Sequence, residues 1–288
     1  MKITVLGGSG FLGSHLCDLL TQQGHDVNIF DIKTSKYIKK NQKMYLGSIL
    51  NSKQLSRAIK GSDFVYHFAA LVDMDSARTR PLKSAEINIT GTINALNVSL
   101  KHRVKRFIFA SSIYANTEEG GFYGSSKKAA ESYVERFYET FGLKYTILRF
   151  GSLYGSRSDD TNGINVIINS GIRKRKLIYS GTRNAARNYI HVKDAINLCT
   201  KVVKKKYENK YLIITGKKRI KVKKLMRIVA DFLKISKNKI KFLNGKHVGH
   251  YVNEPTLFTP RAGKKINIKN EQDIEKNLKH LINEIRKK

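Results

Sequence analysis

The distribution of apolar residues predicts a regular alternation of strands and helices over the first half of the chain. Apolar runs of strand length occur at 3–6, 27–30, 44–46, 64–68, 106–110 and 145–150. Between them, the segments 12–20, 52–60, 84–102 and 123–141 repeat apolar residues at the three- and four-residue spacing of an amphipathic helix. The run at 64–68 is nearly unbroken, as expected for a strand covered on both faces. This alternation indicates an α/β fold with a doubly wound parallel sheet.

The alternation loosens after residue 150. Short apolar segments at 177–179 and 211–215, and helical patterns at 192–203 and 222–233, predict a smaller mixed α/β part. We therefore expect a first domain over residues 1–150 and a smaller part over 151–288, within which the chain can return to the sheet. No repeat and no Pro- or Ser-rich linker separates them, so we expect the two parts to pack around a cleft.

The first predicted strand runs into a glycine-rich turn with the GxxGxxG spacing of Gly7, Gly10 and Gly13. Such glycines allow a tight turn, let a pyrophosphate approach the backbone and let the next helix pack closely. The helix N-terminus then offers N–H groups and a positive dipole end to phosphates. Asp31 ends the second strand, where a carboxylate accepts hydrogen bonds from an adenosine ribose and repels a 2′-phosphate. A tight turn in an unrelated α/β protein is the alternative, but this context favours a Rossmann-type site for NAD.

A possible proton-transfer set follows later in the chain. Ser111 and Ser112 end the predicted strand at 106–110, at the sheet edge where ligands bind. Tyr123 and Lys127 are four residues apart on a predicted helix and share a face. We expect the ammonium to favour the phenolate and so to lower the pKa of Tyr123. A Tyr and a Lys at this spacing are more often a surface pair, but behind a dinucleotide site the pattern favours proton transfer.

The formal net charge of +33, from 55 Lys and Arg against 22 Asp and Glu, is consistent with nucleic acid, an anionic membrane surface or acidic small molecules as partners. The basic clusters are scattered between elements, which favours a solvated surface over a nucleic-acid groove. Cys17 and Cys199 lack metal-ligand spacing, so we expect free thiols in a reducing compartment and no metal site. No run is long enough to span a membrane, and no secretion signal is evident, so we expect a cytoplasmic protein.

With these motifs the chain resembles the extended short-chain dehydrogenases/reductases of the NAD-dependent sugar-nucleotide epimerase/dehydratase family. Further matching stretches are His67 to Ala70, Asn88 with Gly91 and Thr92, residues 148–157 and residues 187–195. The resemblance covers almost the whole chain. The late pair His250 and Tyr251, with Pro255 and Pro260, resembles epimerase-like members of bacterial surface-glycan pathways.

The resemblance implies roles for individual residues. Tyr123 would be the catalytic base, Lys127 its partner and ribose anchor, and Ser112 the third member, although the choice between Ser111 and Ser112 depends on the alignment. Asn88 would order the active-site helix. The residues implied to bind NAD are Gly7, Gly10, Phe11, Leu12, Gly13, Asp31, Ile32, Ser48, Ile49, Phe68, Ala69, Ala70, Asn88, Tyr123 and Lys127. Those implied to bind substrate are Ser111, Ser152, Arg157 and Arg187, the last at the nucleotide diphosphate.

The resemblance also implies a homodimer, formed through the helices at 84–102 and 123–141. The resemblance further implies that the smaller part over 151–288 binds the substrate.

Some positions depart from the family pattern. Ser48 stands where many members carry an Asp that contacts adenine, and Ser152 replaces a more usual Asn. Asn188 and Ser156 likewise replace a common Asp and a common Pro.

The residues after Ser112 bear on the reaction. Ile113 and Tyr114 stand where 4,6-dehydratases carry an Asp-Glu pair that removes water, so dehydration is disfavoured. We therefore expect NAD-dependent epimerisation of a UDP- or GDP-linked sugar, at carbon 4. The alternatives are a one-way NAD(P)-dependent sugar-nucleotide dehydrogenase or keto-sugar reductase and, from another class, a non-catalytic nucleic-acid-binding or assembly protein.

Overall fold

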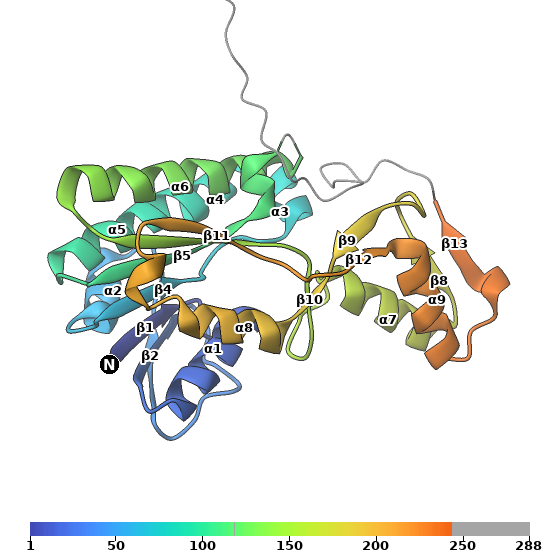
Figure 1. The fold of residues 1–288 in the computed structure, drawn as a ribbon, viewed down its shortest axis with the longest axis horizontal. Coiled ribbons are helices and arrows are strands. Elements are labelled where there is room, and N and C mark those ends of the chain that lie inside the picture. Colours follow the sequence, from blue (N-terminus) through green and yellow to red (C-terminus); the bar gives the residue numbers. More distant parts are fainter. Residues whose placement is uncertain (118, 244–288) are drawn as a thin grey trace, which may run out of the picture. The chain divides into compact units, whose positions relative to one another are not determined.

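A seven-stranded parallel sheet forms the centre of the protein in this computed structural model, which describes residues 1–117 and 119–243 (Figure 1). Its strand order is β11-β6-β5-β4-β1-β2-β3, and every neighbouring pair is parallel. The strands are β1 (Lys2–Leu6), β2 (Asp26–Asp31), β3 (Gln42–Leu46), β4 (Phe64–His67), β5 (Arg106–Ser112), β6 (Tyr145–Phe150) and β11 (Lys210–Ile214). The chain order reverses between β1 and β4, which is where ligands bind in sheets of this kind.

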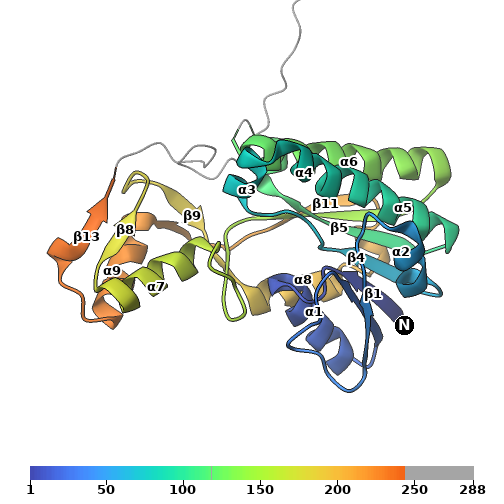
Figure 2. The ribbon, with the colours of Figure 1, turned by 180° about the vertical axis from the view of Figure 1, so that it is seen from behind.

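Helices cover both faces of the sheet (Figures 1 and 2). One face carries α1 (Phe11–Gln22) and α8 (Val192–Lys201), and the other carries α2 (Ser52–Ile59), α5 (Gly91–Lys101) and α6 (Gly121–Phe141). The predicted doubly wound α/β fold is therefore confirmed.

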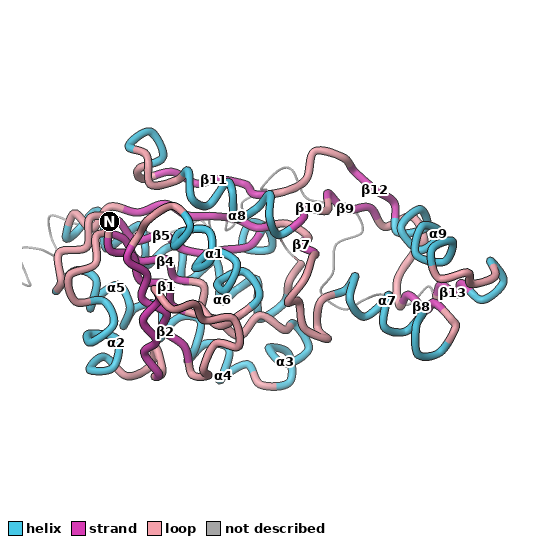
Figure 3. The backbone as a smooth tube through the Cα atoms, turned by 90° about the horizontal axis from the view of Figure 1, so that it is seen from below, coloured by secondary structure: helices cyan, strands magenta, loops and turns pink. Residues whose placement is uncertain are grey.

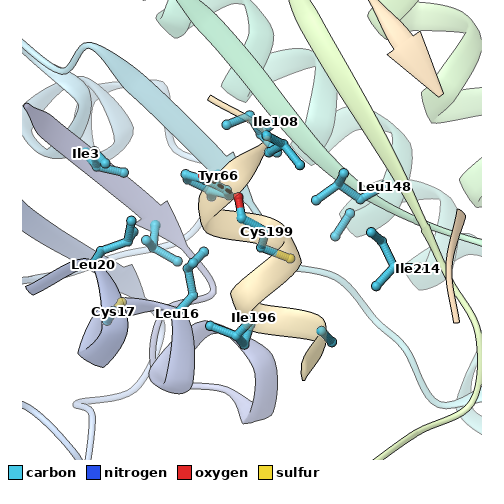
Figure 4. Packing of buried hydrophobic residues seen from close by; sticks show 14 of the residues in the cluster. Ile3, Leu16, Cys17, Leu20, Tyr66, Ile108, Leu148, Ile196, Cys199 and Ile214 are labelled. Carbon is cyan, nitrogen blue, oxygen red and sulfur yellow. Dashed lines mark hydrogen bonds between the residues drawn. The ribbon is translucent and has the colours of Figure 1, made fainter. Parts of the chain in front are cut away.

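The core under α1 and α8 also contains both cysteines (Figure 4). Cys17 and Cys199 are buried free thiols, as predicted, and burial raises the pKa of each. The Tyr66 hydroxyl donates a hydrogen bond of 2.9 Å to the carbonyl of Cys199. This bond fixes α8 against the central strand β4.

The helical segment before β5 is less regular than its sequence pattern predicts. It begins as α3 (Met74–Thr79) and α4 (Pro81–Ala85), passes through a π-helical turn, η1 (Glu86–Thr90), and continues as α5. A π turn inserts an extra residue into the helix, and such turns are frequent at functional sites. Here the turn contains the buried Asn88.

The remaining described elements form three two-stranded sheets with two helices. Strand β7 (Leu153–Tyr154) pairs with β10 (Ile190–His191), β9 (Ala186–Asn188) with β12 (Arg219–Lys221), and β8 (Leu177–Tyr179) with β13 (Ile240–Phe242). Helices α7 (Gly163–Lys174) and α9 (Val222–Phe232) share a small core with β8, and Figure 3 shows these elements gathered together. Short 3₁₀ turns are η2 (Ile113–Asn116), η3 (Lys205–Tyr207) and η4 (Lys237–Lys239).

Strand β11 returns the chain from this smaller part to the edge of the central sheet, beside β6. The expected domain boundary at residue 150 stays a prediction, although the sheet itself extends past it. The described residues belong to one compact unit that spans 1–258. The predicted motif around His250, Tyr251, Pro255 and Pro260 lies outside the described residues. Within the described chain, no helix combines the length and apolar character that crossing a bilayer requires.

Candidate active site

The glycine turn after β1 touches the segment that follows β4. Gly7 has φ +82°, and a Cβ atom there would lie 2.5 Å from the backbone nitrogen of Ala69. A Cβ on Gly13 would lie 2.1 Å from the carbonyl oxygen of Gly7. Helix α1 starts after Gly10 with no side-chain cap, so side chains do not occupy its first amide groups. The turn therefore has the close backbone approach and the helix N-terminus that a pyrophosphate needs.

Asp31 is held beside this turn. Its Oδ2 accepts a hydrogen bond of 3.0 Å from the Ser9 amide, and its Oδ1 accepts one of 3.3 Å from the Lys33 amide. The Ser9 hydroxyl in turn donates to the Lys33 carbonyl. These bonds keep a carboxylate at the end of β2, next to the glycine turn, which fits the adenosine ribose of NAD.

Two further residues predicted to bind the cofactor lie between β3 and α2. The Ser48 amide donates to Gln54 Oε1, and its hydroxyl accepts from the Leu50 amide. Ile49 is buried, and a Cβ on Gly91 would lie 2.5 Å from its Cδ1 atom. The structure therefore packs the segment proposed to meet the adenine against the start of α5.

Ser112, Tyr123 and Lys127 come together at the carboxyl end of β5. A hydrogen bond joins the side chains of Ser112 and Tyr123. Lys127 Nζ donates to the Ala110 carbonyl at 2.9 Å and lies 6.0 Å from the centre of the Tyr123 ring. The structure thus brings together the three residues that the sequence predicted as a set.

The predicted direction of the Tyr123 pKa is wrong. Burial raises the pKa of Tyr123 to about 12, although its hydrogen bond with Ser112 lowers it. Burial also lowers the pKa of Lys127 to about 8, while the charge of Glu131 raises it. Both shifts have the same cause, because removal from water disfavours the charged form of each group. The sequence pattern gave the spacing of the pair but not its burial.

The two candidate serines differ in their contacts. Ser112 bonds to Tyr123, whereas the Ser111 hydroxyl is buried and has no hydrogen-bond partner among the described residues. These contacts favour Ser112 as the third member of the set.

Asn88 connects the π turn to α6. Its Oδ1 accepts a hydrogen bond of 2.7 Å from the Leu71 amide, and its Nδ2 donates to the Leu71 carbonyl and to the Ser126 hydroxyl. Ser126 lies one residue before Lys127. The side chain therefore links the loop after β4, which includes Phe68, to the helix that bears Tyr123, in keeping with the ordering role predicted for it.

The residues predicted to bind substrate lie in different places. Arg187 is buried in β9, and its Nη2 donates to the Tyr179 hydroxyl at 3.4 Å. Ser152 precedes β7, and its carbonyl accepts from the Ile190 amide. Arg157 instead points to α1, where its Nη2 donates to Asp18 Oδ2 at 2.7 Å. The sequence did not predict this contact.

Sequence analysis missed two residues that lie next to the set of Ser112, Tyr123 and Lys127. Glu131 accepts hydrogen bonds of 2.9 and 2.7 Å from Nε and Nη2 of Arg149 in β6. Glu131 lies four residues after Lys127, so it shares the helix face and acts on the charge of the lysine. The four-residue spacing was a signal that could have identified Glu131. The pairing with Arg149 depends on how α6 packs on the sheet.

The described residues contain no group of three or more His, Cys, Asp or Glu side chains that could hold a metal ion. Asp159 bonds to the Thr161 amide and hydroxyl within its own loop, and Asp160 accepts from Asn169. These acids have local structural contacts.

Comparison with known proteins decides the family. Residues 3–214 match the NAD dependent epimerase/dehydratase family. The chain belongs to this family. NAD is the cofactor of the family, and the glycine turn with Asp31 fits it.

Individual relatives carry out different reactions within the epimerase/dehydratase family. A protein named as a candidate UDP-glucose 4-epimerase in Methanocaldococcus jannaschii is 30% identical over 67% of this chain and 70% of its own length. A dTDP-D-glucose 4,6-dehydratase from Dictyostelium discoideum is 27% identical over 71% of this chain and 56% of its own. The crystal structure of UDP-glucose 4-epimerase from Thermotoga maritima with UDP-glucose has a TM-score of 0.80 and 26% identity, and covers 90% of both chains.

Proposed function

We propose that this member of the family is an NAD-dependent epimerase of a nucleotide-activated sugar, acting at carbon 4. The arrangement of Ser112, Tyr123 and Lys127 at the carboxyl end of β5 carries the proposal. Relatives and a solved structure named as UDP-glucose 4-epimerases support UDP as the nucleotide. GDP-linked sugars are tested as well, because no contact described for Arg187 distinguishes uracil from guanine.

The mechanism follows from the chemistry of these side chains. As the phenolate, Tyr123 would take the proton of the sugar hydroxyl through Oη and later return it. The Ser112 hydroxyl, which hydrogen-bonds to Tyr123, would also bond to the sugar oxygen. Lys127 keeps a positive charge beside the phenol, anchored on the Ala110 carbonyl. NAD, which the glycine turn and Asp31 would hold, would supply the hydride acceptor for the sugar carbon. The keto sugar would turn over between these steps, so that the hydride returns to the opposite face of the same carbon while Tyr123 Oη gives the proton back to the carbonyl oxygen.

The residues after Ser112 favour epimerisation over dehydration. Ile113 is buried, and Tyr114 follows it in the 3₁₀ turn η2. Neither side chain is a carboxyl group that could protonate a leaving hydroxyl and remove a carbon-bound proton. Arg187 in β9 is proposed to bind the diphosphate, for which a guanidinium offers paired donors.

The test uses the purified full-length chain with UDP- and GDP-hexoses. We expect epimers to interconvert without net formation of NADH, and Tyr123→Phe to lower kcat about 100-fold or more. Tyr133→Phe, which removes an exposed hydroxyl from the same helix, is the matched control and should retain activity. Epimerisation that is unchanged in Tyr123→Phe would end the assignment.

A one-way dehydrogenase or reductase is the second candidate because it would use the same three residues. It differs only in whether the keto sugar leaves the protein. NADH that accumulates in proportion to substrate consumed would favour this reaction, and a 4-keto-6-deoxy product would favour dehydration.

A further inference from the structure

The loop that follows β7 is fastened to α1 at two points. Arg157 Nη2 donates to Asp18 Oδ2 at 2.7 Å, and His15 Nε2 donates to the Ser156 carbonyl at 2.9 Å. Asp18 and His15 lie on the helix that begins at the phosphate-binding turn. The ion pair is partly shielded, because 13% of the Asp18 side chain and 21% of the Arg157 side chain are exposed. Such a pair is stronger than a fully solvated one.

The loop between β2 and β3 joins the same contact. The guanidinium carbon of Arg157 lies 4.1 Å from the centre of the Tyr37 ring, a distance at which cation and ring attract. Lys39 Nζ lies 3.5 Å from the second oxygen of Asp18. Tyr37 and Lys39 follow Asp31 in the chain by only a few residues. We call the four side chains of Arg157, Asp18, Tyr37 and Lys39 the Arg157 clasp.

The backbone at the clasp is constrained. Arg157 has φ +66°, a left-handed conformation that costs a non-glycine residue about 1–2 kcal/mol. Gly155 has φ +143°, and a Cβ there would lie 2.6 Å from Val192 Cγ1. The contacts of the Arg157 side chain offset this cost and fix the direction in which the loop leaves β7.

The other end of this loop belongs to the smaller part of the chain. Leu153 and Tyr154 of β7 pair with Ile190 and His191 of β10. Strand β10 lies three residues after Arg187, which we propose binds the nucleotide diphosphate. One short loop therefore runs from the segments proposed to bind the nucleotide sugar to the segments that bind the adenosine end of NAD.

We propose that Arg157 is a positioning residue for NAD, which holds the loop at 33–41 closed beside Asp31 and couples NAD binding to nucleotide-sugar binding. The first part rests on the NAD site alone, and the coupling rests also on the proposed function. Coupling of this kind is reciprocal. A ligand of the smaller part raises the affinity for NAD by the same factor by which NAD raises the affinity for that ligand.

The first experiment measures NAD affinity by calorimetry on full-length protein freed of cofactor, with no turnover. We expect Arg157→Met to lower the affinity for NAD about tenfold, equivalent to the loss of one charge-assisted contact. We also expect faster amide hydrogen exchange at 33–41 in the NAD-bound variant.

Arg175→Met is the matched control. Arg175 also has a positive φ, +49°, and also joins two segments, through the carbonyls of Leu233 and Lys234, but it has no contact with the clasp. It should leave NAD affinity and exchange at 33–41 unchanged. If Arg157→Met weakens NAD no more than Arg175→Met does, the proposal is overturned.

A double-mutant cycle separates the clasp from a general loss of stability. Asp18→Asn and Arg157→Met should each weaken NAD, and the double variant should be little worse than either alone, because both remove one contact. Arg157→Lys keeps the ion pair but loses the planar stack on Tyr37, so it should rank between wild type and Arg157→Met. Additive losses in the cycle would argue against the clasp.

The coupling is measured with UDP and, in parallel, GDP as probes. In wild type, we expect the tighter-bound of the two to strengthen NAD about fivefold or more, and in Arg157→Met the factor should fall toward one. A wild-type factor of one would remove the coupling but leave the NAD result standing. Normal coupling in a protein that does not epimerise any sugar would sink the proposed reaction and leave the clasp intact.

Discussion

At the scale of single residues, the reactivity of Tyr123 is set by two opposing effects. Burial raises the pKa of its phenol to about 12, and the hydrogen bond with Ser112 pulls the pKa down. In the proposed mechanism, Ser112 would therefore both contact the substrate hydroxyl and control the proton affinity of Tyr123.

Replacing Ser112 should shift the pH dependence of catalysis. Without its hydrogen bond, the pKa of Tyr123 rises further, so we expect the alkaline rise of kcat in Ser112→Ala to move to higher pH. A pH profile of kcat measures this, with Ser111→Ala as the control that keeps the bond. An unchanged profile in Ser112→Ala would show that the bond does not control the base.

Lys127 should cost stability at neutral pH. Its pKa is about 8 in the folded protein and 10.5 as the reference value, so the unfolded chain binds more protons between these values and stability rises with pH across that window. The penalty is complete below pH 8 and gone above pH 10.5. In urea unfolding, the free energy of unfolding of Lys127→Met relative to wild type should be about 3 kcal/mol higher at pH 7 than at pH 10.5. Lys128→Met, at the neighbouring exposed position, is the matched control because it removes a lysine charge from the same helix.

The sequence does not show how deeply a side chain is buried, and this limits what it predicts about single residues. Spacing was enough to select Tyr123 and Lys127, because positions four apart share a helix face. Predicting the direction of each pKa shift would have required knowing how deeply Tyr123 and Lys127 are buried, and that depends on how α6 packs on β5. The partner of Arg157 is 139 residues away on α1, and no local pattern connects them.

At the scale of elements, the contact between η2 and α6 sets the distance from Ser112 to Tyr123. A Cβ on Gly124 would lie 2.9 Å from the Glu119 carbonyl and 3.0 Å from the Tyr114 carbonyl. Backbone atoms cannot rotate away as a side chain can. The absence of a side chain at Gly124 therefore lets α6 approach the end of β5.

We expect Gly124→Ala to separate these elements. It should lower kcat about tenfold or more and lower the melting temperature by a few degrees, because the helix must shift by a fraction of an ångström. Gly163→Ala, at the start of α7 where a Cβ would meet nothing within 4 Å, is the control. Equal effects of the two substitutions would contradict the close-approach argument.

The positions of strands and helices were largely predictable, because the residues that pack into the core have the apolar spacing typical of each element. The sheet strands lie within a few residues of the apolar runs, and α6 begins at Gly121 where the pattern begins at 123. The π turn was not predictable. A continuous apolar helical pattern gives no sign of one inserted residue, and the bonds of Asn88 that accompany it are long-range.

At the scale of the whole molecule, α6 exposes several aromatic side chains. Phe141, Tyr133 and Tyr138 are exposed on this helix. The family resemblance predicts dimerisation through the helices at 84–102 and 123–141, and an aromatic surface on the second of them is consistent with such an interface.

Light scattering should therefore show a homodimer. The double substitution Tyr133→Asp and Phe141→Asp should convert it to a monomer, because it would bury two charges in the interface. Phe232→Asp, at an exposed position on α9, should leave the dimer intact. A wild-type monomer would contradict the prediction.

The positive charge is concentrated in the smaller part. Residues 163–190 contain six basic and no acidic residues, and 216–243 contain eleven basic residues and one acid. We expect weak RNA binding that disappears at about 0.2 M salt, as for sequence-independent attraction to phosphates. A filter-binding titration with and without NAD checks this. Salt-resistant RNA binding that competes with NAD would instead favour the nucleic-acid-binding alternative.

The return of the chain as β11 has a consequence for how this protein can diversify. The segments between β6 and β11, and beyond β11, leave from the two strands at one end of the sheet, β6 and β11, while the glycine turn, Asp31 and the Ser112 set lie on or beside β1, β2, β5 and α6. If these segments bind the sugar as proposed, they can be replaced without changing the strands and turns that surround the proposed NAD site. Grafting residues 159–189 from a relative should alter which hexose is accepted and spare the redox machinery, provided that Arg157 is kept at the joint.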